Sequence, residues 1–159
     1  MAGRRRIPPL FFTAAAAVYA LDRVTKLLAE KYLEGHAPVT IVPHIVQLTF
    51  VRNSGGAFGI LGHQPWLFFG ATILVCLGIL VSLPRVSSLP SAVGLGMILG
   101  GALGNLTDRV IHSAGVVDFV DFHVWPVFNM ADSAIVVGAI VVVLAGLGRK
   151  REPAPAHES

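Results

Sequence analysis

Charged residues are scarce in this sequence, and they are unevenly spread. Asp, Glu, Lys and Arg make up only 13% of the 159 residues, whereas apolar residues make up 54% and mean hydropathy is +0.72. A soluble protein of this length needs a more highly charged surface. Four long apolar stretches separate the charges. The composition therefore indicates an integral membrane protein, and the length indicates a single domain.

Cysteine and metal-binding patterns are also lacking. The one cysteine, Cys76, lies inside an apolar stretch, which excludes a disulfide framework and indicates a buried, inert thiol. The six histidines form neither an HExxH motif nor a pair at metal-ligand spacing, so we expect no metal and no cofactor. The glycine-rich run 94–105 is no nucleotide loop, because it lies within an apolar stretch. Its Gly96, Gly100 and Gly104, at four-residue spacing, indicate close helix packing.

The apolar stretches cover residues 7–28, 65–83, 86–106 and 127–147. The length of each stretch is close to the roughly 20 residues that a helix needs to cross a bilayer. The N-terminus resembles a signal peptide, but it continues into a charged, helix-like segment, which indicates an uncleaved first span. We therefore predict an all-α membrane protein with four transmembrane helices.

Lys and Arg residues predict the orientation of these spans. They are dense on the very short segments that lie inside if both termini are cytoplasmic, as the positive-inside rule requires. This topology is a simpler explanation of the net charge of +3 than an acidic partner. Residues 1–150 then form a single four-span domain, and residues 151–159 form a disordered cytoplasmic tail.

The outer loop 29–64 has a pattern of its own. Val46, Leu48 and Phe50 alternate with polar residues at the period of a strand, and residues 40–42 are expected to pair with them. Residues 53–56 read as a turn. The sequence thus predicts a small extracytoplasmic β-sheet between helices 1 and 2. The second outer loop, 112–126, is short and contains two aspartates.

Polar residues of three spans fall at one depth. Asp22, Asn105 and Asp132 each lie about 23 to 29 Å along a helix from the basic residue at its inner end. Because the hydrocarbon layer is about 30 Å thick, all three are expected near its outer boundary. Ionisable groups within spans generally face the bundle interior and are functional candidates.

Each of these groups also has a purely structural interpretation. Asp22 and Lys26, four residues apart, form a plausible ion pair at a helix end. Asn105, Asp108 and Arg109 share one helix face, where they either serve function or cap the helix and reach the interface.

Asn129 and Asp132 are three residues apart. Asn129 fits a helix N-cap, and the positive end of that helix favours the Asp132 charge. Capping and catalysis are equally good interpretations of Asp132 alone.

Asp118 is harder to explain structurally, because it lies in an apolar loop at the level of Asp132. Two carboxylates that converge in a poorly hydrated site cannot both ionise cheaply, so one tends to hold a proton. Such a pair can activate water and protonate a carbonyl oxygen, as in aspartic proteases. The alternatives are a small transporter or proton channel, disfavoured because the charges cluster at one depth, and a non-catalytic lipid-binding scaffold.

Five sequence blocks, in order, resemble lipoprotein signal peptidase, also called signal peptidase II: "DRVTK" (22–26), "VRNSGGAFGIL" (51–61), "GGALGNLTDRV" (100–110), "GVVDFVDF" (115–122) and "FNMADSAI" (128–135). The resemblance implies an aspartic endopeptidase of the bacterial inner membrane. It would act at the outer face as a monomer, surrounded by membrane lipids. Its partners would be diacylglyceryl-modified prolipoproteins, which it would cut before the lipidated cysteine, without metal or nucleic acid.

The resemblance also implies roles for individual residues. The catalytic pair falls on Asp118 and Asp132; the valine pair before Asp118 selects it over Asp121, which is then a solvated or structural neighbour. Which of the two aspartates begins protonated stays open, because a coupled pair titrates as a unit. The supporting or substrate-binding positions are Asp22, Lys26, Asn53, Gly104, Asn105, Asp108, Arg109, Asn129 and Ala131.

Overall fold

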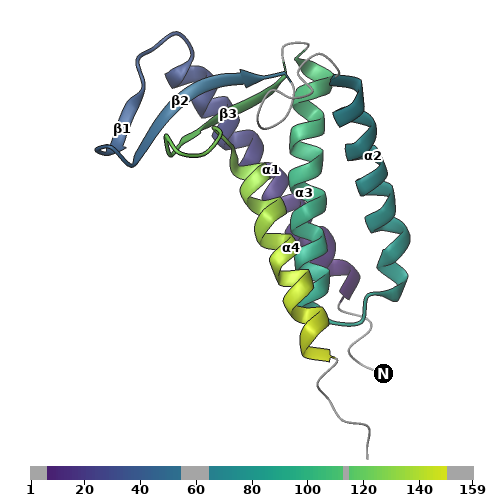
Figure 1. The fold of residues 1–159 in the computed structure, drawn as a ribbon. Coiled ribbons are helices and arrows are strands. Elements are labelled where there is room, and N and C mark those ends of the chain that lie inside the picture. The colour runs from purple at the N-terminus through teal and green to yellow at the C-terminus, as the bar shows by residue number, and fades with distance from the viewer. Residues whose placement is uncertain (1–6, 55–64, 113–114, 150–159) are drawn as a thin grey trace, which may run out of the picture.

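Long helices and one small sheet make up the part of the chain that the computed structural model describes, residues 7–54, 65–112 and 115–149 (Figure 1). The helices are α1 (Ile7–Leu33), α2 (Pro65–Ser82), α3 (Leu89–Ile111) and α4 (Met130–Arg149), and a short 3₁₀ turn, η2 (Leu83–Arg85), follows α2. The strands are β1 (Val39–Val42), β2 (Val46–Asn53) and β3 (Val116–Asp121). Each predicted span thus coincides with a helix, with shifted ends.

Capping residues explain where two of the helices begin. Ser88 caps α3 by accepting a hydrogen bond from the Ser91 amide, so α3 starts later than predicted. The side chain of Asn129 accepts a hydrogen bond from the Asp132 amide at 3.0 Å, and the Asp132 carboxylate accepts one from the Asn129 amide at 3.2 Å. This reciprocal pair is a capping box. The N-cap interpretation of Asn129 is confirmed, and α4 begins only at Met130.

Helix α3 packs closely on both α1 and α4, and Figure 1 shows α2 on its other side. A side chain at Gly96 or Gly100 would collide with backbone carbonyls of α1, and Gly94 and Gly138 face each other between α3 and α4. The close packing predicted from glycine spacing is confirmed. Helix α2 stands apart from this three-helix core, touching mainly α3.

Three of the helices are long and apolar enough to cross a membrane. They are Trp66–Arg85, Leu89–Ile111 and Met130–Gly148. The fourth predicted span, on α1, does not belong to this group in the described part of the chain. Its second half contains Asp22, Arg23 and Lys26. Length and composition therefore support three of the four predicted spans.

The antiparallel sheet has the order β1-β2-β3. The predicted pairing of residues 40–42 with the next strand is confirmed, with Val39 opposite Leu48. The predicted small sheet between helices 1 and 2 is confirmed for β1 and β2, but the prediction missed its third strand. This strand, β3, comes from the segment predicted as a loop between α3 and α4. A valine-rich, aromatic segment suits a strand, but its partner β2 lies more than 60 residues earlier.

One face of the sheet packs against α1. A hydrophobic cluster there contains Leu48 and Phe50 of β2, Val117 and Phe119 of β3, and Ala29 and Leu33 of α1. Because side chains alternate along a strand, Asn53 and Asp118 are left for the opposite face. The turn predicted at 53–56 and the tail 151–159 extend beyond the described residues.

Candidate active site

The predicted convergence of polar residues from three helices is confirmed. The Asn105 side-chain amide of α3 donates to an Asp132 carboxylate oxygen of α4 at 2.8 Å. The Asp22 carboxylate of α1 accepts a hydrogen bond from the Ala131 amide, in the first turn of α4, at 3.0 Å. The three helices therefore place Asp22, Asn105 and Asp132 at one level, as the distances along the helices indicated.

Asn129 connects Asp118 to Asp132. Its side-chain nitrogen donates to Asp118 Oδ1 at 2.6 Å, and its backbone amide donates to Asp132 Oδ2 at 3.2 Å. Asp118 is buried on β3, and Asp132 is half-buried in the first turn of α4. A single residue thus fixes the relative position of both carboxylates.

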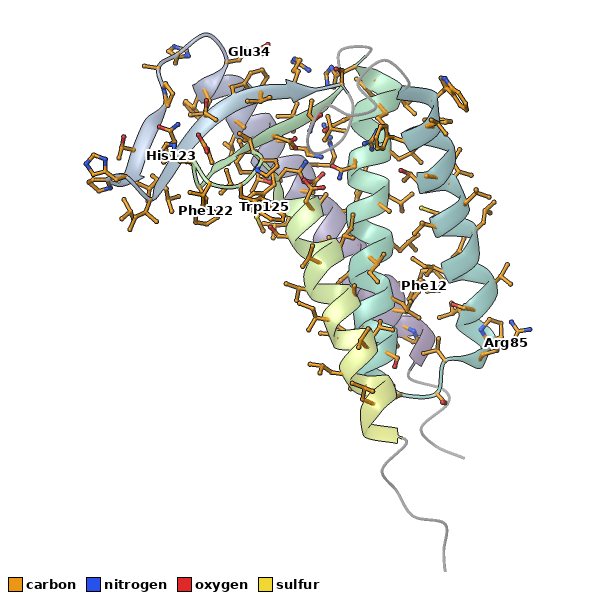
Figure 2. The ribbon with its side chains drawn as sticks, viewed as in Figure 1. Phe12, Glu34, Arg85, Phe122, His123 and Trp125 are labelled. Atoms are coloured by element: carbon orange, nitrogen blue, oxygen red, sulfur yellow. The ribbon has the colours of Figure 1, made fainter. Side chains whose placement is uncertain are left out.

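Both carboxylates line one cavity of about 260 Å³. Asn53, Asn105 and Arg109 also line it, so most of the sequence-predicted polar residues meet here. The segment before α4, residues 125–128, forms another wall. Figure 2 shows Trp125 between the sheet and the N-terminal end of α4. Sequence analysis did not single out Trp125 or Pro126, and an aromatic residue in a loop is a weak signal.

Asn105 lies at the centre of the hydrogen-bond network. Its side-chain oxygen accepts from Lys26 Nζ at 2.8 Å and from Asn129 Nδ2 at 3.1 Å, while its nitrogen donates to Asp132. Buried side-chain amides normally have hydrogen-bond partners, and here both the oxygen and the nitrogen of Asn105 have them. The Asn105 side chain thus contacts Asp132, Lys26 and Asn129, and its functional role stays a prediction.

Three buried charged side chains and one partly buried arginine form an ion-pair network between α1 and α3. Lys26 lies 3.0 Å from Asp22 and 2.9 Å from Asp108, and all three side chains are fully buried. Arg23 pairs with the other carboxylate oxygen of Asp108, Oδ1. Two positive and two negative charges offset one another, which buried charges require. The predicted Asp22–Lys26 pair is confirmed, whereas Arg23 was missed because its partner is on another helix.

The two buried carboxylates of this network hold the backbone next to the cavity aspartates. Asp108 accepts a hydrogen bond from the Val117 amide at 3.1 Å, one residue before Asp118. Asp22 accepts one from the Ala131 amide, one residue before Asp132. Asp108 and Asp22 therefore hold the backbone beside Asp118 and Asp132 in place.

Gly104 and Ala131 provide room for these contacts. A side chain at Gly104 would collide with the Asp22 carboxylate. Ala131 is fully buried, and its carbonyl lies where a side chain on Gly101 would project. Both positions require a small residue because α1, α3 and α4 meet there.

Asn53 and Asp121 lie at opposite ends of the β2–β3 pair. The Asn53 side chain donates to Asp118 Oδ2 at 3.0 Å. Asp121 instead accepts from Gln47 Nε2 at 2.7 Å and from the His123 amide at 2.6 Å, and these bonds hold its pKa below the usual range. The interpretation of Asp121 as a structural neighbour agrees with these contacts.

Arg109 separates the aspartate cavity from a second, apolar one. Its guanidinium donates to the Asn105 carbonyl oxygen at 3.2 Å and lies 5.9 Å from the Phe68 ring centroid of α2. The second cavity, about 230 Å³, is lined by α2, α3 and α4, and shares Asn105 and Arg109 with the first.

Burial dominates the electrostatics of Asp118. Burial, with a smaller contribution from the nearby Asp132 charge, raises the pKa of this carboxyl group to about 6. Hydrogen bonds from Asn53 and Asn129 act in the opposite direction, because donors stabilise the ionised form. Asp118 therefore holds a proton at a higher pH than an ordinary aspartate. Across the described ranges, His, Cys, Asp and Glu side chains form no group of three suited to a metal ion.

A protein-family model described as signal peptidase (SPase) II matches residues 14–147. The chain belongs to the signal peptidase II family. Lipoprotein signal peptidases of Pelotomaculum thermopropionicum and Mycobacterium avium are 40% and 46% identical to this family member over 136 and 143 residues. These alignments cover 84% and 87% of this chain, and 89% and 79% of the relatives.

Solved structures agree with this family assignment. One, described as a bacterial membrane enzyme determined by the in meso method at 2.3 Å resolution, matches with a TM-score of 0.83. It is 29% identical, and the match covers 94% of both chains. A second of the same description, at 1.9 Å, has a TM-score of 0.77 and 31% identity over 86% of this chain and 92% of its own. This signal peptidase II family member is therefore a membrane peptidase.

Proposed function

We propose that the chain is an aspartic endopeptidase that removes the signal peptide from diacylglyceryl-modified prolipoproteins, cutting before the lipidated cysteine. The observation that carries the proposal is the link that Asn129 makes between two carboxylates lining one cavity. Family membership supports the substrate class. Neither a metal nor a covalent intermediate is needed, because two carboxyl groups can supply both the acid and the base.

In this mechanism Asp132 takes a proton from a water while Asp118 donates its proton to the scissile carbonyl oxygen. The raised pKa of Asp118 supports its role as the acid. Water attack gives a tetrahedral diol intermediate. Asp132 then donates its newly acquired proton to the leaving amide nitrogen, and Asp118 recovers a proton from the diol hydroxyl. The carbon–nitrogen bond breaks, and the pair returns to its starting protonation.

Asn105 and Asn129 would hold the two carboxylates in fixed positions relative to each other throughout the catalytic cycle. Each donates a hydrogen bond from its side chain to one of the two, Asn105 to Asp132 and Asn129 to Asp118. Positioning of this kind is a large part of catalysis, because small misplacements slow a reaction strongly.

The apolar cavity beside Arg109 suits the lipid-linked part of the substrate. It opens between α2 and α4, where α2 makes most of its contacts with α3 alone. A signal helix and its lipid could enter there from the membrane, which would place the peptide bond in the adjoining cavity. A largely apolar lining with a few polar groups at one end is typical of ligand sites.

The proposal includes a four-span topology, with α1 as the fourth span. Helix α1 runs beside α3, where Gly96 and Gly100 lie close against its backbone, and it buries Asp22 and Lys26 against the core. Both termini would be cytoplasmic in the inner membrane, and the sheet and cavity would lie outside. Arg85 lies at the opposite end of the helices from the sheet (Figure 2).

A cysteine-labelling experiment tests this orientation. In a Cys76→Ala background, Thr40→Cys on the exposed β1 strand should react with a membrane-impermeant maleimide in intact spheroplasts. Ser87→Cys, near Arg85, should react only after lysis. Reaction of Ser87→Cys in intact spheroplasts would contradict the topology.

Purified protein and a defined precursor test the reaction itself. The protein is incubated in detergent with the same prolipoprotein in diacylglyceryl-modified and unmodified forms, and the products are identified by mass spectrometry. We expect cleavage of the modified form alone, immediately before the lipidated cysteine. Equal cleavage of both forms, or cleavage elsewhere, would contradict the proposal.

A further inference from the structure

A second group of charged side chains lies outside the aspartate cavity, where α1, β2 and the end of α3 meet. Arg52 of β2 lies 3.5 Å from Glu30 and 3.4 Å from Glu34, both on α1. His112, which caps the C-terminal end of α3, lies 3.4 Å from the same Glu30 oxygen. Figure 2 shows Glu34 near the end of α1 that faces the sheet. We call Glu30, Glu34, Arg52 and His112 the Arg52 cluster.

Arg52 and Asn53 lie on opposite faces of the end of β2. Arg52 is in step with Phe50, whose ring centroid lies 5.2 Å from the guanidinium and which packs against the α1 side of the sheet. Asn53, the next residue, donates its hydrogen bond to Asp118 on the other face. The period of two along a strand explains this division. Arg52 of the Arg52 cluster is thus the residue next to Asn53, which donates the hydrogen bond to Asp118.

The β2–β3 ladder ends here, and its backbone pairing joins this end of β2 to β3 but not to α1. The register of β2 and β3 shifts between Leu48 and Val51, and Arg52 and Asn53 pair beyond that irregularity with Val117 and Val116. Asn53 is the last residue of the strand. A contact that joins its neighbour to α1 therefore adds a constraint that the ladder does not supply.

We propose that Glu30 and Arg52 are positioning residues, which hold the end of β2 against α1 so that Asn53 stays within hydrogen-bonding distance of Asp118. The inference rests on the proposed function, since it assumes that Asp118 reacts. Glu30 is the central member because it faces both Arg52 and His112, and so connects β2 to the end of α3. Partly exposed ion pairs add little to overall stability, so the effect should be local.

The test uses two single variants. Arg52→Met removes the charge but keeps an apolar side chain over Phe50, and Glu30→Gln removes the charge of its partner. We expect kcat on a lipidated precursor to fall about tenfold in each variant, with KM little changed, as for loss of one well-placed hydrogen bond. Arg52→Lys should retain most of the activity. Gln47→Ala is the matched control, because it removes a β2–β3 contact at the far end and should leave kcat unchanged.

A double-mutant cycle separates positioning from a general structural effect. If the Arg52 cluster acts through Asn53, Arg52→Met should cause no further loss in an Asn53→Ala background. The alkaline limb of the pH profile should also move to higher pH in Arg52→Met, because a lost donor raises the pKa of Asp118. The charged groups around Asp118 are Lys26, Arg109 and Asp132, and those around Arg52 are Glu30, Glu34 and His112.

Additive losses in the cycle, or full activity of both Arg52→Met and Glu30→Gln, would overturn the inference. Asp118→Asn is measured in parallel. If Asp118→Asn is inactive while Arg52→Met is fully active, the positioning role fails and the proposed function stands. If Asp118→Asn is active, the proposed function itself fails.

Discussion

At the scale of single residues, the surroundings of Asp118 and Asp132 differ in ways that suit different tasks. Asp118 is buried on a strand and accepts side-chain hydrogen bonds from two asparagines. Asp132 lies in the first turn of a helix and accepts one hydrogen bond from a backbone amide and one from a side chain. The helix end favours a negative charge at Asp132, whereas burial raises the pKa of Asp118.

The raised pKa of Asp118 predicts how stability depends on pH. A carboxyl group whose pKa is about 6 in the folded protein stabilises the fold below its ordinary pKa, and this contribution is lost as pH rises through about 6. The free energy of unfolding should fall by on the order of 1 kcal/mol between about pH 5 and about pH 7.5. Thermal unfolding in detergent measures it.

Asp118→Asn provides the comparison for this prediction, because it removes the titrating group and leaves the other acids and histidines in place. The pH-dependent loss of stability should be clearly smaller in Asp118→Asn than in the wild-type protein. Identical pH dependence in both proteins would show that Asp118 has an ordinary pKa.

Several residue-level features could be predicted because they depend on local spacing. Asp22 and Lys26 lie four apart on one helix, and Asn129 and Asp132 lie three apart at a helix start. The Arg23–Asp108 pair and the Asn129–Asp118 hydrogen bond join different elements. No periodicity within one segment indicates which distant residue will be the partner.

At the scale of elements, the close approach of α3 to α1 determines the position of Asp22. Gly104 allows the Asp22 carboxylate to lie against the α3 backbone, and from there it reaches the Ala131 amide of α4. Glycine spacing predicted the packing, but not that the last glycine faces a carboxylate. Strand β3 was missed because its only indication was local composition, whereas its formation depends on pairing with β2.

Gly104→Ala should therefore displace Asp22 and disturb the backbone before Asp132. We expect a loss of about 1–3 kcal/mol in the free energy of unfolding, which is typical of overpacking, and a fall in cleavage rate. Thermal unfolding and precursor cleavage measure the two effects. Gly78→Ala on α2 is the control, because among the described residues the added methyl group meets no side chain and no neighbouring element within 4 Å. Equal behaviour of the two variants would contradict the positional role of Asp22.

At the scale of the whole molecule, α1, α3 and α4 form a tight core, and α2 stands to one side (Figure 1). Among the described residues, hydropathy predicted where the long helices lie, although only α2, α3 and α4 are apolar enough to cross a membrane. It gave no indication of which helix would be loosely packed. The apolar cavity beside Arg109 follows from that arrangement, because α2 leaves space between itself and α4.

Filling the apolar cavity should impair use of the lipidated substrate. Ala71→Trp on α2 places a large ring in the cavity lining, and we expect KM to rise about tenfold through loss of apolar contact area. Leu74→Trp is the matched control, because Leu74 is on the same helix, 70% exposed, and does not line the cavity. Steady-state cleavage in detergent gives both constants. A similar KM in the two variants would exclude the cavity as the lipid route.

The most direct test of the account is the cleavage rate of Asp118→Asn and Asp132→Asn beside Asp121→Asn. All three variants replace a carboxylate with an isosteric amide, and Asp121 shares strand β3 with Asp118 but contacts Gln47 and His123 instead. With folding verified by thermal unfolding, the first two should lose activity by about 10²- to 10⁴-fold or more, the usual contribution of general acid–base catalysis. Asp121→Asn should cleave at nearly the wild-type rate. A folded Asp118→Asn or Asp132→Asn protein that cleaves the lipidated precursor as fast as Asp121→Asn would contradict the account.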